Sequence, residues 1–181
     1  MTRIAPVNRA NAEPGTEKLL QGIEKKMGGV PNILATMANS TATAGAYLGM
    51  SQALAGGELG PRIREQIALT VGELNGCEYC VSAHTMLGKN AGLNDYELDL
   101  ARRGRADDAR TDAALRFARQ IVDVRGHVSD EALADVRSAG FSEGEITEII
   151  ANVALNLFTN YFNHVADTAI DFPKVDSLAA A

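Results

Sequence analysis

Apolar residues recur every three to four positions along most of this chain, and glycine or proline interrupts the spacing at short intervals. This period predicts amphipathic α-helices, because positions i, i+3, i+4 and i+7 share one helix face. The expected helices cover residues 16–27, 41–55, 61–74, 77–90, 112–124, 129–136 and 143–168, with shorter ones around 33–37 and 95–103. No segment shows the alternation expected of strands. The sequence therefore predicts an all-α fold, either a helical bundle or an orthogonal packing of helices.

The expected helix ends carry residues with specific backbone or capping properties. Gly28-Gly29 and Asn75-Gly76 stop the helices before them, and Pro61 suits the first turn of the helix that it opens. Ser142 is followed three positions later by Glu145, which is the capping-box pattern at the start of the last helix. We expect one domain over residues 1–181, with a core at about 16–168, an extended N-terminal arm and a C-terminal tail.

Length, charge and hydropathy argue against several classes of protein. A chain of 181 residues is long enough to bury a core without disulfide staples. A net charge of −6 argues against a nucleic-acid or anionic-membrane surface, and no apolar stretch is long enough to span a bilayer. The N-terminus lacks the apolar run of a signal peptide, so the expected compartment is the reducing cytoplasm. There, two cysteines separated by two residues are more often redox-active or metal-binding than structural.

Both cysteines and one of the three histidines lie within residues 76–84. Cys77 and Cys80 follow a helix break, so they occupy the first turn of a new helix, where free N–H groups and the helix dipole stabilise an anion. His84 lies four residues after Cys80, on the same helix face, and could take its proton. Glu65, on the preceding helix, could orient the imidazole or receive the proton through water. Cys77 could trap a sulfenic acid on Cys80 as a disulfide. These four residues are the candidate catalytic set.

Two other roles for the cysteines stay open at this point. The four candidate side chains could bind zinc, which takes four protein ligands in a structural site or three in a catalytic one. Alternatively, the cysteines could simply be small buried side chains. No second Cys or His pair is present elsewhere. We therefore favour redox chemistry and expect no metal and no cofactor.

The candidate set also resembles a known signature. Eleven residues separate Glu65 from Cys77, two separate the cysteines, and three separate Cys80 from His84. This spacing resembles that of the alkylhydroperoxidase D-like / carboxymuconolactone decarboxylase-like family. The flanks 62–69 and 71–75 look similar to the same family, and segments 160–164 and 171–173 are similar to its peroxidase-related branch. The resemblance covers roughly residues 30 to 175.

The resemblance implies an all-α fold that forms trimers or hexamers, and a thiol-dependent peroxidase that needs neither metal nor haem. It assigns Cys80 as the peroxidatic cysteine, Cys77 as the resolving cysteine, and Glu65 with His84 as a proton relay. The partners that it implies are a hydroperoxide substrate, an external dithiol or lipoyl-type reductant, and further copies of the chain. The best-studied members carry a histidine where this chain has Tyr79. If that histidine transfers protons, turnover here is weak; for Tyr79 we expect a packing role.

Three other functions are compatible with the same residues. The CxxC pair could serve a disulfide oxidoreductase or redox relay with little peroxide chemistry. Lactone decarboxylation is the other chemistry of the superfamily, although those members do not rely on a cysteine pair. A non-enzymatic redox sensor or a zinc-stabilised interaction module is the third.

Several residues outside this set also carry expectations. His164 and Asn160 share a face of the last helix and could line the same pocket or form a polar contact. His127 follows a glycine in a loop and is expected to be solvated. Arg62 and Arg64 are expected to pair with surface carboxylates such as Glu58, and the run at 102–105 to form a solvated turn facing the acidic residues 107–108.

The segment that holds the candidate set is similar in sequence to part of the last expected helix. At a constant offset, Glu65 overlays Glu148, Cys77 overlays Asn160, Cys80 overlays Asn163 and His84 overlays Asp167. Such an overlay suggests a duplicated helical hairpin whose second copy lacks the thiols. The alternative is a coincidence, because two amphipathic helices of similar period overlay somewhere.

Overall fold

The computed structural model describes residues 2–176 and 178, and this part of the chain is helical with no strand. A short 3-10 helix η1 (Arg9–Asn11) precedes α1 (Pro14–Met27), α2 (Asn32–Met37), α3 (Thr41–Ala55), α4 (Pro61–Leu74), α5 (Glu78–Asn90), α6 (Asp95–Arg102), α7 (Ala109–Asp123), α8 (Asp130–Ser138) and α9 (Glu143–Ala166). The predicted all-α fold is therefore confirmed. No helix in the described residues is long and apolar enough to cross a membrane.

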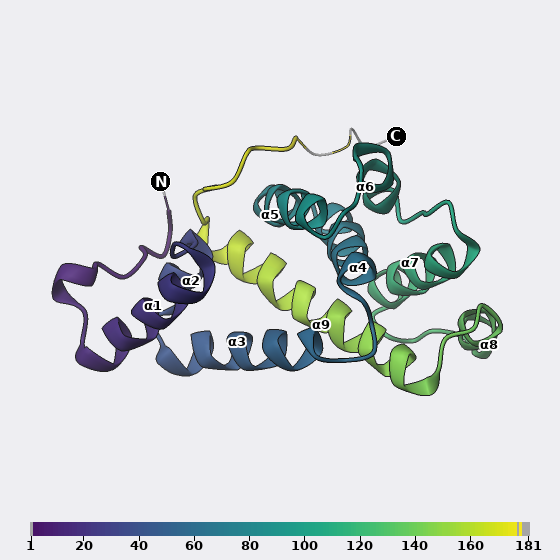
Figure 1. Cartoon of the computed structure of the whole chain (residues 1–181), viewed down its shortest axis with the longest axis horizontal. Helices are drawn as coiled ribbons and strands as arrows, with labels where there is room; N and C mark the ends of the chain where they lie inside the picture. Colours follow the sequence, from purple (N-terminus) through teal and green to yellow (C-terminus); the bar gives the residue numbers. More distant parts are fainter. Residues whose placement is uncertain (1, 177, 179–181) are drawn as a thin grey trace.

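Helix α9 runs through the middle of the molecule, and the other helices are arranged around it (Figure 1). Helices α4 and α5 lie on one side of α9 and α3 on the other, with α1 and α2 at one end and α7 and α8 at the opposite end. Helix α4 contacts α5, α6, α7 and α9. After α9, the chain passes over α5 towards α6 (Figure 1).

The buried apolar side chains form two clusters. The larger one joins α4 to α7, α8 and α9 and includes the fully buried Ile67, Leu115 and Ile149. The smaller one joins α1, α2 and the start of α5, and both cysteines belong to it. Burying apolar area is the main favourable term in folding, so the thiols are held inside a part of the molecule that is itself stabilised by packing.

Most of the predicted helix ends agree with the structure to within two residues. Gly28 ends α1 with φ 78°, and Gly76 lies at φ 64° between α4 and α5, both in the left-handed region that glycine adopts without strain. Ser142 and Glu145 form the predicted capping box. Helix α7 begins three residues before the predicted start at residue 112, because the Asp108 side chain accepts a hydrogen bond from the Thr111 N–H at 2.8 Å.

The duplicated hairpin is not present. Residues 143–166, where the second copy was expected, form one continuous helix. The first copy is broken by Asn75-Gly76, whereas the corresponding positions of α9 are Phe158 and Thr159, which have no need of a left-handed backbone. One overlaid pair nevertheless meets in space, because Asn163 contacts Cys80, as described below.

Candidate active site

The break between α4 and α5 positions the two cysteines. Gly76 turns the chain so that the Cys77 N–H donates to the Gly72 carbonyl oxygen at 2.9 Å. Cys77 is the N-cap of α5, and its sulfur accepts a hydrogen bond from the Cys80 N–H at 3.4 Å. A Cβ on Gly72 would lie 3.6 Å from the Cys80 Cβ, so a small residue in α4 lets α5 approach closely. Both sulfurs therefore sit at the positive end of a helix.

The cysteines are joined as a disulfide and are almost completely buried. Cys77 is 1% exposed and Cys80 is 3% exposed, among apolar side chains of α1 and α2. Only small or slender molecules can reach sulfurs at this depth without a rearrangement of the protein.

Asn163 of α9 contacts both sulfurs. Its Nδ2 lies 3.2 Å from the Cys80 Sγ and 4.0 Å from the Cys77 Sγ. A nearby N–H donor stabilises a thiolate. The adjacent turn of α9 carries Asn160, which is fully buried and accepts a hydrogen bond from the Asn75 Nδ2 at 2.9 Å. Two asparagines of α9 thus contact the region of the helix break: Asn160 binds Asn75, and Asn163 binds the Cys80 sulfur.

Sequence reasoning missed the role of Asn163. The available signal was the overlay of Asn163 on Cys80, together with the resemblance of segment 160–164 to the peroxidase-related branch. Helical spacing alone could not show that α9 faces the start of α5.

Glu65 and His84 form the expected pair. The Nδ1 of His84 lies 2.7 Å from the Oε2 of Glu65, with side chains 21% and 22% exposed. A proton on Nδ1 that is held by the carboxylate leaves Nε2 free to accept another proton. His84 and Cys80 line the same small cavity, of about 70 Å³. In the described residues no hydrogen bond joins His84 to a sulfur.

Two tyrosines lie in the walls of this region. The Tyr79 hydroxyl accepts a hydrogen bond from the Ile33 N–H at 3.2 Å, and its ring packs edge-to-face on Phe172 at 5.5 Å. Burial raises the pKa of Tyr79 well above its usual value. Burial, and then the Glu65 charge, raise the pKa of Tyr47. Tyr79 therefore packs, as expected from the sequence.

A second cavity, of about 240 Å³, adjoins the first. Tyr47, His84 and Thr159 line both cavities. The first is lined mainly by apolar side chains, whereas the second holds Glu65 and Arg64. The Glu65–His84 pair therefore stands between an apolar space beside Cys80 and a more polar space beside α3 and α9.

The remaining histidines lie outside these cavities. His164 is exposed and lines a shallow hollow beside Cys77, and Asn160 is buried next to Asn75. His164 and Asn160 therefore do not share a pocket, and the alternative expectation of a polar contact is confirmed for Asn160, which accepts from Asn75. His127 is exposed in the loop before α8, as expected.

The predictions about arginines were confirmed only in part. Arg62 pairs with a surface carboxylate, as expected, but the partner is Glu97; Arg64 has no ion pair in the described residues, and Glu58 accepts from the Ser142 hydroxyl at 2.9 Å. Arg102 is no part of a solvated turn: it binds Glu73 at 2.8 Å, with side chains 12% and 11% exposed. Pairing choices of this kind depend on helices that are distant in sequence, so local charge patterns did not reveal them.

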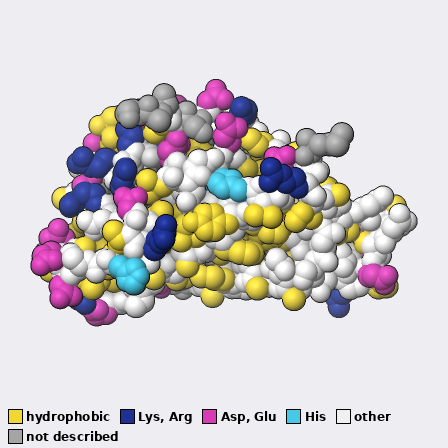
Figure 2. All heavy atoms as spheres, turned by 180° about the vertical axis from the view of Figure 1, so that it is seen from behind, with side chains coloured by type: hydrophobic (Ala, Val, Ile, Leu, Met, Phe, Trp, Pro, Cys, Tyr) yellow, Lys and Arg dark blue, Asp and Glu magenta, His cyan; other side chains and the backbone are white. Residues whose placement is uncertain are grey.

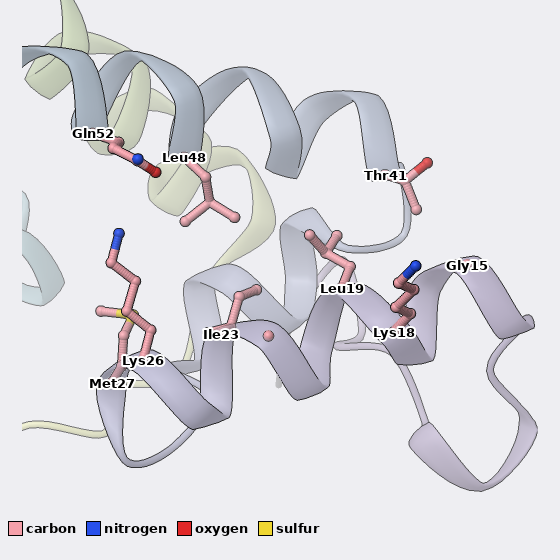
Figure 3. Close-up of a pocket in the computed structure, with 10 residues that line it drawn as sticks. Gly15, Lys18, Leu19, Ile23, Lys26, Met27, Thr41, Leu48 and Gln52 are labelled. Carbon is pink, nitrogen blue, oxygen red and sulfur yellow. The ribbon is translucent and has the colours of Figure 1, made fainter.

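A hollow between α1 and α3 carries no candidate chemistry. It measures about 500 Å³ and lies between α1 and α3, where Leu19, Ile23 and Leu48 face one another and Lys18 and Lys26 stand at its edges (Figure 3). It contains no cysteine, histidine or carboxylate. Among the residues that the structure describes, no group of three Cys, His, Asp or Glu side chains is arranged to hold a metal ion, so the zinc alternative lacks a ligand set.

Comparisons with known proteins agree with this geometry. Residues 41–123, which include all four candidate residues, match the model of the carboxymuconolactone decarboxylase family. No curated protein matches the chain in sequence.

Three solved structures share the fold. A peroxidase-related protein from Ralstonia eutropha JMP134, described as an alkylhydroperoxidase AhpD core, is 23% identical, with a TM-score of 0.84 over 94% of this chain and 92% of that one. A peroxidase-related protein from Silicibacter sp. TM1040 is 24% identical, with a TM-score of 0.79 over 92% of each chain. The debrominase Bmp8, as a cysteine-to-alanine variant in complex with 2,3,4-tribromopyrrole, is 24% identical, with a TM-score of 0.79 over 94% of this chain and 92% of that one.

The match of residues 41–123 to the carboxymuconolactone decarboxylase family model agrees with the resemblance drawn from the CxxC spacing, and the solved structures show that the chain shares its fold with alkylhydroperoxidase-like proteins.

Proposed function

We propose that the protein is a thiol-dependent peroxidase that reduces organic hydroperoxides with the Cys77–Cys80 pair. One observation carries this proposal: the Cys80 sulfur stands in the wall of an apolar cavity, with an amide donor at 3.2 Å and the Glu65–His84 pair lining the same region. A nucleophile, an anion-stabilising donor, a base and a resolving thiol are thereby brought together.

In this reaction the two thiols supply the electrons and His84 supplies the proton for the leaving alcohol. The Cys80 thiolate attacks one peroxide oxygen, so an S–O bond forms, the O–O bond breaks, and the alcohol leaves after it takes a proton from His84. Cys77 then attacks the Cys80 sulfur, so the disulfide forms and water leaves. The two thiols have supplied the two electrons that reduce the peroxide.

Burial of the disulfide limits the size of the reductant that can reach the sulfurs. Sulfurs that are 1% and 3% exposed are difficult for a folded protein thiol to attack. A small dithiol, or a lipoyl group on a slender arm, suits the site better. We expect reduction by dihydrolipoamide to be much faster than reduction by a thioredoxin-like protein, as measured by thiol release under matched reductant concentrations.

Reductive dehalogenation is a second candidate. The fold is shared with a debrominase, and the cavity beside Cys80 is lined by aromatic and aliphatic side chains that suit an apolar ring. The dithiol could supply the two electrons that replace a carbon–halogen bond by a carbon–hydrogen bond, with release of halide. Bromide release from 2,3,4-tribromopyrrole tests this activity.

Self-association is also part of the proposal, with helix α3 as the contact surface and a second copy as the partner. Helix α3 contains no Asp, Glu, Lys or Arg, and Ala44 is its one buried residue. Its exposed Ala46, Gly49, Met50 and Ala53 are small or apolar, which suits close helix packing. Figure 2 shows hydrophobic side chains gathered in a band across the middle of one face of the molecule. We expect an oligomer by light scattering that Met50→Asp dissociates; a monomeric wild type would contradict this.

The peroxidase proposal is tested by counting thiols. Dithiol-reduced protein is treated with one equivalent of cumene hydroperoxide, beside Cys80→Ser. We expect rapid loss of both thiols in the wild type and no peroxide consumption by Cys80→Ser. Thiols that survive peroxide but exchange readily with lipoamide would instead identify a disulfide oxidoreductase, and thiols inert to both would leave a structural role.

A further inference from the structure

Arg64 differs from the other arginines near the site because its charge has no acidic partner. Its Nε is buried and has no hydrogen-bond partner among the described residues, and none of their carboxylates pairs with its guanidinium. Its neighbour in the sequence, Arg62, is paired with Glu97. A buried N–H group without a partner is uncommon and costs free energy, so the residues around Arg64 do not satisfy its guanidinium group.

The surroundings of Arg64 indicate where such a group would lie. Arg64 lines the cavity of about 240 Å³ between α3, α4 and α9. Glu65 is the one carboxylate lining this cavity, and its Oε2 is bound to His84 at 2.7 Å. Arg64 is the one arginine or lysine in the same wall. The cavity wall thus contains a cation, Arg64, and one carboxylate, Glu65, which is already paired with His84.

The cavity that Arg64 lines adjoins the one beside Cys80. Tyr47, His84 and Thr159 belong to both this cavity and the smaller apolar one beside Cys80. A molecule held at Arg64 could therefore extend an apolar part past His84 towards the Cys80 sulfur. Cavities of about 70 Å³ and 240 Å³ suit a small organic molecule rather than a peptide.

We infer that Arg64 binds a carboxylate of the substrate in the α3–α4–α9 cavity, so that the preferred substrates are hydroperoxides of organic acids with an apolar body. The inference rests on the proposed function for the reactive group, and on the unpartnered arginine for the anionic group. Guanidinium groups bind carboxylates through paired, charge-assisted hydrogen bonds, which a lysine reproduces only in part. The carboxylate could belong to a fatty acid or to an aromatic acid; both present the same anion to Arg64.

The kinetic test compares two hydroperoxides that differ by one carboxylate group. Cumene hydroperoxide and its 4-carboxylate derivative are each reacted with dithiol-reduced protein, and the second-order rate constants are expressed as a ratio. We expect the wild type to prefer the carboxylate by at least about tenfold. Arg64→Gln is expected to lose this preference and Arg64→Lys to retain part of it. Arg62→Gln, a change to the adjacent paired arginine, should retain the wild-type ratio.

A binding test makes the inference independent of turnover. Binding of the unreactive 4-isopropylbenzoate to the disulfide form is measured by calorimetry, with 4-isopropylbenzamide as the uncharged control. We expect the wild type to bind the acid at least about tenfold more tightly than the amide, and Arg64→Gln to bind both equally. Thermal melting of each variant verifies that it is folded.

The two tests separate failure of the inference from failure of the proposed function. If neither hydroperoxide is consumed but the acid binds through Arg64, the anion site stands and the peroxidase assignment fails. If hydroperoxides are consumed with no preference for the carboxylate, or if Arg64→Gln binds the acid as the wild type does, the inference is overturned.

Discussion

The α4–α5 hairpin and helix α9 share a sequence pattern and differ in one structural feature. Glu65, Cys77 and Cys80 overlay Glu148, Asn160 and Asn163 at one constant offset. In the hairpin, Gly76 breaks the helix at φ 64°, whereas α9 continues without a break to Ala166. The break creates a second helix N-terminus, and the cysteines lie on it.

This difference separates the chemical roles of the two regions. The α4–α5 hairpin presents thiols at a helix N-terminus, where an anion is stabilised. Helix α9 presents buried amides, and Asn163 donates to the Cys80 sulfur at 3.2 Å. One region thus supplies the nucleophile, and the other supplies a polar wall that faces it. Three changes, from the largest expected effect to the smallest, test this division.

Removing the base should have the largest effect. His84→Ala is expected to lower the rate of thiol oxidation by cumene hydroperoxide about a hundredfold, because a positioned base contributes about 10²–10⁴ to such reactions. Stopped-flow measurement of the second-order rate constant tests this. His164→Ala, on the exposed side of α9, is the matched control and should change the rate less than twofold by the same argument. Equal effects of the two changes would contradict the assignment of His84.

Removing the amide donor should have an intermediate effect. Asn163→Leu is expected to lower the thiolate fraction at neutral pH, and with it the oxidation rate, about tenfold, because one donor to an anion is lost. Asn163→Asp should lower both further, since it places a carboxylate against the sulfur. Absorbance at 240 nm against pH, on reduced protein, measures the thiolate. An unchanged thiolate fraction in both variants would show that α9 only packs against the site.

Straining the helix break should have the smallest effect. Gly76→Ala is expected to cost about 1 kcal/mol of the free energy of unfolding, because a side chain disfavours its positive φ. The same substitution at Gly22, inside α1 with open space around it, should instead stabilise the protein by up to about 1 kcal/mol. Urea denaturation of both variants tests the opposite signs. Equal shifts would show that the conformation of Gly76 does not matter.

Local sequence signals predicted much of this molecule. Apolar spacing, glycine stops and the Ser142 capping box gave the helices to within a few residues, because each depends on neighbours in the chain. The spacing of Glu65 and His84 likewise predicted a pair that the structure places at 2.7 Å. What could not be predicted depends on packing between distant helices. The contact of Asn163 with Cys80 joins residues 83 apart, and the unpaired charge of Arg64 is visible only once every other carboxylate has been placed.

The central claim is that Cys80 attacks the peroxide and Cys77 resolves the product. It is tested most directly by treating reduced Cys77→Ser with one equivalent of cumene hydroperoxide and trapping sulfenic acid with dimedone, followed by peptide mass spectrometry. The account predicts a stoichiometric adduct on Cys80 and none in Cys80→Ser treated identically. An adduct on Cys77 in Cys80→Ser, with an unmodified Cys80 in Cys77→Ser, would reverse the two roles, and no adduct in either variant would contradict peroxide chemistry at this site.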